Sequence, residues 1–325
     1  MSVKPRNRAA DLLAWSFLAA GVLGLLMRYA AKDRVPALAV VFYGLPPLVA
    51  ALLFAVSLAL GLRRPRRRWQ VVVPGVLMVV ALIAWIQTDL VRSRGAGGMG
   101  DPLRVVLWNV SRPSATDASF VPVLQEADAQ ILFLVECGGH SAARRHFWES
   151  HFPGYHVSLL PGQIALLSRY PIAGVHCTTA DSRTVVAEYD LILPGGTLAV
   201  VAVDVASAHC SRRRYSFEQI NAIARSKRRP VLVLGDFNTP HTSILFDELR
   251  RSFCHAFEES GTGLITTWPS LFPVLALDHI WLSEGLAPVH TVLRRTLHSD
   301  HALVIADIAV EKAGTPHELV SSVER

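Results

Sequence analysis

The chain has 325 residues, too many for one compact domain and enough for two units. Hydrophobic residues make up 51% of it, and its mean hydropathy of +0.34 is high for a wholly soluble protein. The sequence pI of 9.4 reflects the first hundred residues, which carry 13 Lys/Arg against 3 Asp/Glu, whereas residues 101–325 carry 19 against 23. This mildly acidic remainder argues against broad attraction to a polyanion and gives no strong sign of sequence-specific nucleic-acid binding.

The first hundred residues contain three long apolar runs. They cover residues 12–31, 35–62 and 71–86. A membrane-spanning helix needs roughly 20 apolar residues, so we expect residues 1–92 to be a membrane anchor with about three transmembrane helices in a lipid bilayer. The first run could instead be a cleaved signal peptide, but two more spans follow it and no small-residue cleavage site is visible. Prolines interrupt the second run, and neighbouring helices in a bilayer can accommodate such breaks.

Basic residues predict the orientation of these helices. Eight flank them on one side, namely Lys4, Arg6, Arg8 and the five arginines of 63–68. Five lie on the other side, namely Arg28, Lys32, Arg34, Arg92 and Arg94. The excess favours a cytoplasmic N-terminus, so three spans would make a multi-pass protein of the cell membrane with everything after residue 90 extracytoplasmic. Two spans would reverse this result. Residues 93–101 are rich in glycine and predict a flexible linker.

The second unit, residues 102–311, has the pattern of alternating strands and helices. Apolar, often β-branched runs predict strands at 103–110, 129–135, 164–168, 185–193, 198–203, 231–234, 277–282 and 302–310. Helical spacing appears at 118–126, 217–224 and 243–251. Residues 312–325 form a polar tail that we expect to be disordered.

Polar side chains stand where several of these strands end. Asn109 closes the first strand, Glu136 the second, and Asp236 and Asn238 follow the buried run at 231–234. In α/β proteins ligand chemistry collects at such strand ends, because the loops there can vary while the strands hold position. Each residue alone also fits a structural role, such as a turn cap or a surface ion pair.

Six short motifs occur in one order along the chain. They are Trp-Asn-Val at 108–110, Ile-Leu-Phe-Leu-Val-Glu at 131–136, Leu-Leu-Ser-Arg-Tyr-Pro-Ile at 166–172, Gly-Asp-Phe-Asn at 235–238, Leu-Asp-His-Ile at 277–280 and Ser-Asp-His at 299–301. In this order the chain resembles the endonuclease/exonuclease/phosphatase superfamily, metal-dependent phosphoesterases that share the pancreatic deoxyribonuclease fold. The resemblance implies an α/β fold of two packed β-sheets flanked by helices, a four-layer sandwich with its active site at one rim.

The resemblance also implies a divalent cation, Mg²⁺ or Mn²⁺, which suits carboxylate and amide oxygens. Glu136 would be the main metal ligand, with Asn109 and Asp300 near the same ion. The activity would be hydrolysis of a phosphate mono- or diester. Nuclease, lipid phosphodiesterase and small phosphatase activities all stay open.

The remaining motif residues would act on the substrate. Asp236 would orient or deprotonate the attacking water, and the Asn238 amide would hold a phosphoryl oxygen. His301 would carry a proton or a positive charge opposite the phosphate, aligned by the Asp278 carboxylate.

One position departs from the family pattern. A histidine normally ends the strand that precedes the Gly-Asp-Phe-Asn strand, but this chain has Asp204 there, and its next histidine is His209. Asp204 could replace the leaving-group acid if burial kept it protonated, or it could bind metal; His209 could replace it if its loop folds back. The departure leaves an alternative in which the domain is catalytically silent and binds a phosphorylated ligand or a protein partner.

Overall fold

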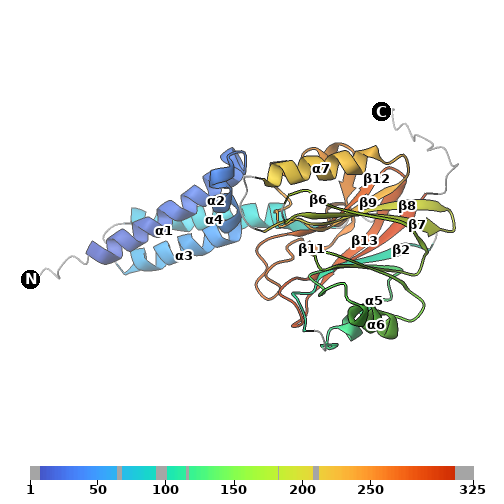
Figure 1. Cartoon of the computed structure of the whole chain (residues 1–325). Coiled ribbons are helices and arrows are strands. Elements are labelled where there is room, and N and C mark those ends of the chain that lie inside the picture. Colours follow the sequence, from blue (N-terminus) through green and yellow to red (C-terminus); the bar gives the residue numbers. More distant parts are fainter. Residues whose placement is uncertain are drawn as a thin grey trace, which may run out of the picture.

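The computed structural model describes residues 8–63, 68–92, 101–114, 117–181, 183–207 and 212–311. An N-terminal helical bundle extends from one side of a sandwich of two β-sheets (Figure 1). The predicted four-layer α/β architecture is confirmed. Residues 93–100 of the expected linker, His209 and the expected tail at 312–325 lie outside the described residues.

The bundle is built from the three predicted apolar runs. Its elements are α1 (Arg8–Leu26) with a π-helical turn (Met27–Ala31), the 3-10 turn η2 (Pro36–Leu38), α2 (Ala39–Gly44), α3 (Pro47–Leu62) and α4 (Trp69–Asp89). Two helical segments, Ala9–Ala31 and Trp69–Asp89, are long and apolar enough to span a membrane, and a third is if the bent pair α2–α3 counts as one span.

The second apolar run is therefore not one straight helix. The chain bends by 65° between α2 and α3. The cause is Pro46-Pro47, because proline has no N–H to donate and excludes helical backbone at the residue before it. Leu45 accordingly leaves the helical region, with φ −121° and ψ 57°.

Small residues hold the bundle together. Ala50, Ala51, Phe54 and Ala81 are buried between the helices, and a Cβ on Gly21 would lie 2.6 Å from the Phe54 ring. Helices in a bilayer approach closely through such small residues, since lipid offers no hydrophobic force between them. Large apolar side chains cover the outside of the bundle, as lipid contact requires.

Each sheet of the sandwich has six strands. One sheet, here the β2 sheet, has the order β13 (Leu286–Arg294), β14 (Leu303–Val310), β2 (Leu103–Asn109), β3 (Ile131–Val135), β5 (Ile164–Ser168), β4 (His156–Leu160). The other, here the β9 sheet, has the order β10 (Phe253–His255), β12 (Asp278–Ser283), β9 (Val231–Asp236), β8 (Gly196–Asp204), β7 (Val185–Leu193), β6 (Ile172–Thr179).

Three apolar layers pack this domain. The main core lies between the sheets and includes Leu107, Phe133, Val200, Leu234 and Ile280. Helices α5 (Val121–Ala127) and α6 (Ala142–His151) cover the outer face of the β2 sheet, and α7 (Arg213–Ser226) covers the outer face of the β9 sheet (Figure 1). The central strands are buried on both faces, which is why their sequences are almost continuously apolar.

The predicted helix at 243–251 is wrong. Two separate 3-10 turns, η3 (Ile244–Phe246) and η4 (Leu249–Arg251), occupy this stretch. Each turn contributes one buried apolar side chain, Phe246 from the first and Leu249 from the second, to the layer on the outer face of the β9 sheet. The Ser243 hydroxyl caps the first turn by accepting from Leu245 N at 3.1 Å.

The bundle is joined directly to the sandwich. Strand β1 (Leu90–Val91) follows α4 and pairs antiparallel with β11 (Gly263–Leu264), and Ile265 N donates to the Asp89 carbonyl at 2.9 Å. At the other turn of the bundle, the Asp33 carboxylate accepts from Ser243 Oγ and, at 3.1 Å, from Ile244 N. Backbone pairing thus fixes the end of α4 to the sandwich before the glycine-rich stretch begins, and the Asp33 carboxylate fixes the turn after α1.

Candidate active site

Strand register brings the predicted polar residues to one rim of the sandwich. Parallel pairing sets Asn109 on β2 opposite Val135 on β3, so that Glu136 comes one residue beyond it. On the other sheet, Asp236 pairs with Asp204 of β8 and with Asp278 of β12. A pocket of about 490 Å³ opens at this rim. Its lining is Asn109, Ser111, Arg112, Glu136, Ser207, Asp236, Asn238, Leu297, His298, Ser299, Asp300 and His301.

Gly235 fixes the position of Asp236. It has φ +150°, and a Cβ there would lie 1.9 Å from the Val203 carbonyl oxygen of the neighbouring strand. Only glycine fits this close approach of β9 to β8. The following carboxylate is therefore held at a defined point of the rim.

Backbone strain is concentrated at the same pocket. Among the described residues seven non-glycine residues have positive φ, and four of them line the pocket, namely Ser111, Arg112, Glu136 and Asn238. Such conformations are uncommon for residues with a Cβ and persist where surrounding contacts enforce them. Arg112 N, for example, donates to the Glu136 carbonyl at 3.0 Å.

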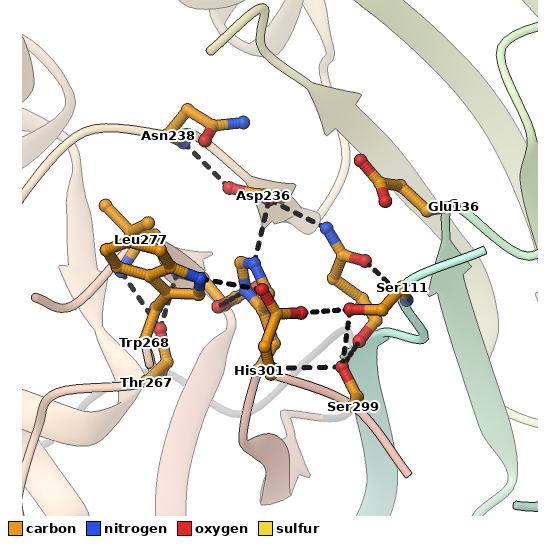
Figure 2. A network of polar contacts seen from close by, with 12 residues as sticks. Ser111, Glu136, Asp236, Asn238, Thr267, Trp268, Leu277, Ser299 and His301 are labelled. Carbon is orange, nitrogen blue, oxygen red and sulfur yellow. Dashed lines mark hydrogen bonds and ion pairs between the residues drawn. The ribbon is translucent and has the colours of Figure 1, made fainter. Parts of the chain in front are cut away.

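Asp236 is the centre of the hydrogen-bond network (Figure 2). One carboxylate oxygen accepts from Asn109 Nδ2 at 3.0 Å and the other from Asn238 N at 2.8 Å. The first of these bonds links the two sheets. Burial raises the pKa of Asp236, as does the nearby Asp278 charge, although His301 and the two donors oppose the rise. The Asn238 amide uses one of its N–H groups on the Val205 carbonyl at 2.8 Å.

His301 and Asp278 form a buried pair beside it. Nδ1 of His301 lies 2.8 Å from Asp278 Oδ2, and its Nε2 faces Asp236 Oδ2 at 4.0 Å. Burial disfavours the imidazolium, but the charge of Asp278, its hydrogen bond and the charge of Asp236 outweigh this and raise the pKa of His301 to about 10. The ring is thus positively charged at neutral pH.

Glu136 and Asp300, two further carboxylates that line the pocket, have different partners. Glu136 stands across the pocket from Trp268 in Figure 2 and pairs with Arg112, whose Nη2 lies 2.8 Å from its Oε1. Both oxygens of Asp300 are already used, one by Ser111 Oγ and one by Trp268 Nε1 at 2.9 Å. Burial alone would raise the pKa of Asp300, yet these two hydrogen bonds lower it.

The site includes polar residues to which the sequence assigned no role. Among them, Arg112 pairs with Glu136, and Ser111 Oγ and Trp268 Nε1 donate to Asp300. Ser299, from the Ser-Asp-His motif, donates from Oγ to the Asn109 carbonyl at 2.6 Å and accepts from His301 N at 3.0 Å. Ser111, Arg112 and Ser299 sit within three residues of an expected site residue, so proximity to the motifs was the available signal. Trp268 had no such signal.

Asp204 lies at the rim, at the end of β8. Burial raises its pKa to about 8, and the charges of Asp236 and Glu136 add to the effect while Arg112 opposes it. It is therefore mostly protonated at neutral pH. His209, the other candidate for the missing histidine, lies outside the described residues.

The charge at this rim suits a divalent cation. Asp204 is repelled by the charges of both Asp236 and Glu136, and Asp278 Oδ1 is buried without a hydrogen-bond partner among the described residues. One ligand atom each of Asp236, Asp278 and His301 lies within 4.8 Å of the others, so this buried group could hold a metal ion. That arrangement requires His301 to lose the proton that Asp278 stabilises. Carboxylate and amide oxygens of Glu136 and Asn109 offer ligands without this cost.

Fold and site together define a phosphoesterase-like domain. The profile of the Endonuclease/Exonuclease/phosphatase family matches residues 106–301, and the chain belongs to this family. No curated protein matches it.

Solved structures share the fold at low identity. The chain is similar to an endonuclease/exonuclease/phosphatase from Bacteroides vulgatus, with a TM-score of 0.55, 16% identity and coverage of 65% of this chain and 100% of that chain. It is similar to the mannosyl-6-phosphatase of Bacteroides thetaiotaomicron, with a TM-score of 0.52, 16% identity and coverage of 64% and 99%. It is also similar to a humanized D. rerio TDP2, with a TM-score of 0.50, 13% identity and coverage of 65% of this chain and 100% of that chain. At these identities the likeness shows the fold alone.

Proposed function

We propose that this protein is a membrane-anchored phosphoesterase that hydrolyses a phosphate mono- or diester with the help of a divalent metal ion. The observation that carries the proposal is the position of Asp236, held by Asn109 and Asn238 beside the His301–Asp278 pair in a pocket that Glu136 also lines. This arrangement joins a base, a cation and further oxygen ligands at one rim.

The side chains divide the reaction between them. Asp236 accepts a proton from water, a task that its raised pKa suits. The water oxygen then bonds to phosphorus while the ester P–O bond breaks. His301, positively charged, stabilises the extra charge on the phosphoryl oxygens, and Asn238 binds one of them. Asp204, protonated at neutral pH, delivers a proton to the departing oxygen.

Glu136 and Asn109 are the residues that would hold the metal ion, with Asp300 nearby. Mg²⁺ or Mn²⁺ would supply positive charge against the charge that develops on the phosphate. The mannosyl-6-phosphatase that shares this fold is named for action on a phosphate ester, the substrate class proposed here.

Three crossings of the membrane are the topology that we propose. Helix α3 packs against both α1 and α4, so the bent pair α2–α3 runs back through the bundle. The first turn of α1 and the sandwich lie at opposite ends of the bundle (Figure 1). With the arginine-rich stretch at 63–68 cytoplasmic, the sandwich is extracytoplasmic. A periplasmic-type reporter fused after residue 311 should be active, and activity of a cytoplasmic reporter alone would contradict this topology.

One observation favours the catalytically silent alternative. Arg112 already pairs with Glu136, and a guanidinium in that place neutralises the main expected metal ligand. A panel of phosphate esters separates the two functions when the full chain in detergent is assayed with Mg²⁺, Mn²⁺ or a chelator. Metal-dependent hydrolysis that Asp236→Asn abolishes supports the enzyme. Binding of phosphorylated compounds with no hydrolysis of any ester supports the silent domain.

A further inference from the structure

Two loops beside the pocket expose large hydrophobic side chains. Among the described residues of 101–311, seven such side chains are exposed, and the two highest fractions in the described chain belong to Leu297 at 85% and Leu271 at 79%. Phe272, next to Leu271, is 55% exposed. Exposed apolar groups gathered at a functional rim mark a contact with another apolar phase or partner.

The loops are connected to the pocket by hydrogen bonds. Ser270, which precedes Leu271, donates from its backbone to the Asp300 carbonyl at 2.6 Å and from its hydroxyl to the Thr296 carbonyl at 3.4 Å. Thr296 precedes Leu297, which lines the pocket itself. The three apolar residues therefore belong to one edge of the active-site opening.

The same loops are connected to the end of the last membrane helix. Ile265 N bonds to the Asp89 carbonyl, and Leu271 is only six positions further along the chain, about 20 Å at full extension. Figure 1 shows the orange and red loops between β11 and β14 on the side of the sandwich from which the bundle extends. The pocket rim and the membrane anchor thus share one side of the domain.

The length of α4 sets the level of the bilayer. Its 21 residues rise about 31 Å, which matches the hydrocarbon thickness of about 30 Å. Asp89 then lies at the boundary of the hydrocarbon, and Leu90 already pairs with the sandwich. Because Leu90 and Val91 pair with β11 directly after α4, the domain is held close to the headgroup layer.

We propose that Leu271, Phe272 and Leu297 enter the membrane surface and that the pocket takes its phosphate ester from a lipid headgroup in that leaflet. This inference rests on the phosphoesterase function proposed above and names its substrate class. Apolar side chains inserted among the headgroups would place the scissile phosphate of a lipid at the pocket.

The opposite end of the sandwich supplies the control. Strand β7 begins at the rim, where Val185 pairs with Asp204, and ends at Leu193. Ile192 near that far end is also exposed, at 42%. A second pocket lies beside it, and basic residues line that pocket, namely Arg225, Lys227, Arg228 and Arg229. Ile192→Ser therefore removes an exposed apolar side chain away from the bundle.

A lipid contact is tested first without any activity. The full chain is placed in nanodiscs of phosphatidylcholine and phosphatidylglycerol, with the photoreactive residue benzoylphenylalanine at position 272 or 192. Illumination should attach lipid to the chain at position 272 and not at 192. Absence of lipid adducts at 272, or equal adducts at both positions, would overturn the inference.

Turnover is then compared on one headgroup in two forms, dihexanoyl phosphatidic acid as dissolved monomers and dioleoyl phosphatidic acid in vesicles. The turnover rate of the double variant Leu271→Ser/Phe272→Ser should fall at least about tenfold on vesicles and less than about twofold on monomers. Only hydrolysis of the vesicle lipid needs apolar side chains to insert into a bilayer. Ile192→Ser should change neither rate. Equal losses on both forms would overturn the membrane contact. If no form of any ester is hydrolysed, the proposed function fails, and the photocrosslink alone still decides whether the rim meets lipid.

Discussion

Asp278→Asn should remove the positive charge from His301. The Asp278 carboxylate is the first of the influences that raise the pKa of this histidine, through its charge and through the hydrogen bond at 2.8 Å. An asparagine keeps the shape and loses the charge. The pKa of His301 should then fall from about 10 to its ordinary value of 6.5 or below, because burial opposes the charge.

The magnitude follows from the shift. A change from 6.5 to about 10 corresponds to about 5 kcal/mol of interaction with the charged form, at about 1.4 kcal/mol per pKa unit. This lies at the upper end of the ~3–5 kcal/mol that breaking a buried ion pair costs. Since the folded pKa is raised, the stabilisation is complete below pH 6.5 and is lost as the pH rises through about 10.

The assay is a pH titration of histidine ¹³Cε1 signals in the metal-free full chain, with His301→Asn identifying the signal. At pH 8 the His301 ring should be protonated in the wild type and neutral in Asp278→Asn. Asp307→Asn is a matched control, because that carboxylate pairs with Arg104 on the β2 sheet instead. A wild-type His301 that titrates near 6.5, or one whose titration Asp278→Asn leaves unchanged, would refute the reasoning.

Three further substitutions test the site. Glu136→Gln should keep the fold and raise the Mg²⁺ concentration needed for half-maximal turnover. Arg112→Gln removes the same ion pair and should not raise that concentration. An unchanged Mg²⁺ requirement in Glu136→Gln would exclude the ligand role. Asp204→Asn should slow hydrolysis of an alkyl ester by about 10²–10⁴-fold and that of an activated aryl ester far less. The wild-type rate on the alkyl ester should fall as the pH rises through about 8, where Asp204 loses its proton, and equal losses on both esters would assign the acid elsewhere. Gly235→Ala should destabilise the protein by about 3 kcal/mol or more, because the added Cβ would meet the Val203 carbonyl. Gly139 has open space around it, so Gly139→Ala should leave the stability unchanged. Equal melting temperatures of the two variants would contradict the close approach at Gly235.

The sequence predicted the buried strands well for a physical reason. Strands such as β3 and β9 are covered on both faces, so each shows an uninterrupted apolar run. Strands β6 and β13 lie at sheet edges, where one face meets solvent or loops, and they contain Gly174 and Pro288. Their mixed patterns gave no strand signal.

The residues of the site also divide into those that the sequence predicts and those that it does not. Asp236, His301 and Asp278 were expected because their motifs stand at the ends of buried strands. The fold brings them together: His301 bonds to Asp278 at 2.8 Å, and its Nε2 lies 4.0 Å from Asp236 Oδ2. Ser111 and Arg112 were not expected, since their part in the site depends on left-handed backbone that residue type alone does not reveal. Trp268 reaches Asp300 across 32 residues, and no local pattern encodes such a contact.

The central claim is that this pocket hydrolyses a phosphate ester with a divalent metal ion. Its most direct test is ³¹P NMR of a hydrolysable phosphate ester incubated with the full chain. The reaction is run first in chelator and then with excess Mg²⁺ or Mn²⁺ restored, and Mn²⁺, which is paramagnetic, is removed before the spectrum is recorded. Product phosphorus signals should appear only after metal is restored, and none should appear with Asp236→Asn. Product that forms equally in chelator, or equally with Asp236→Asn, would contradict it.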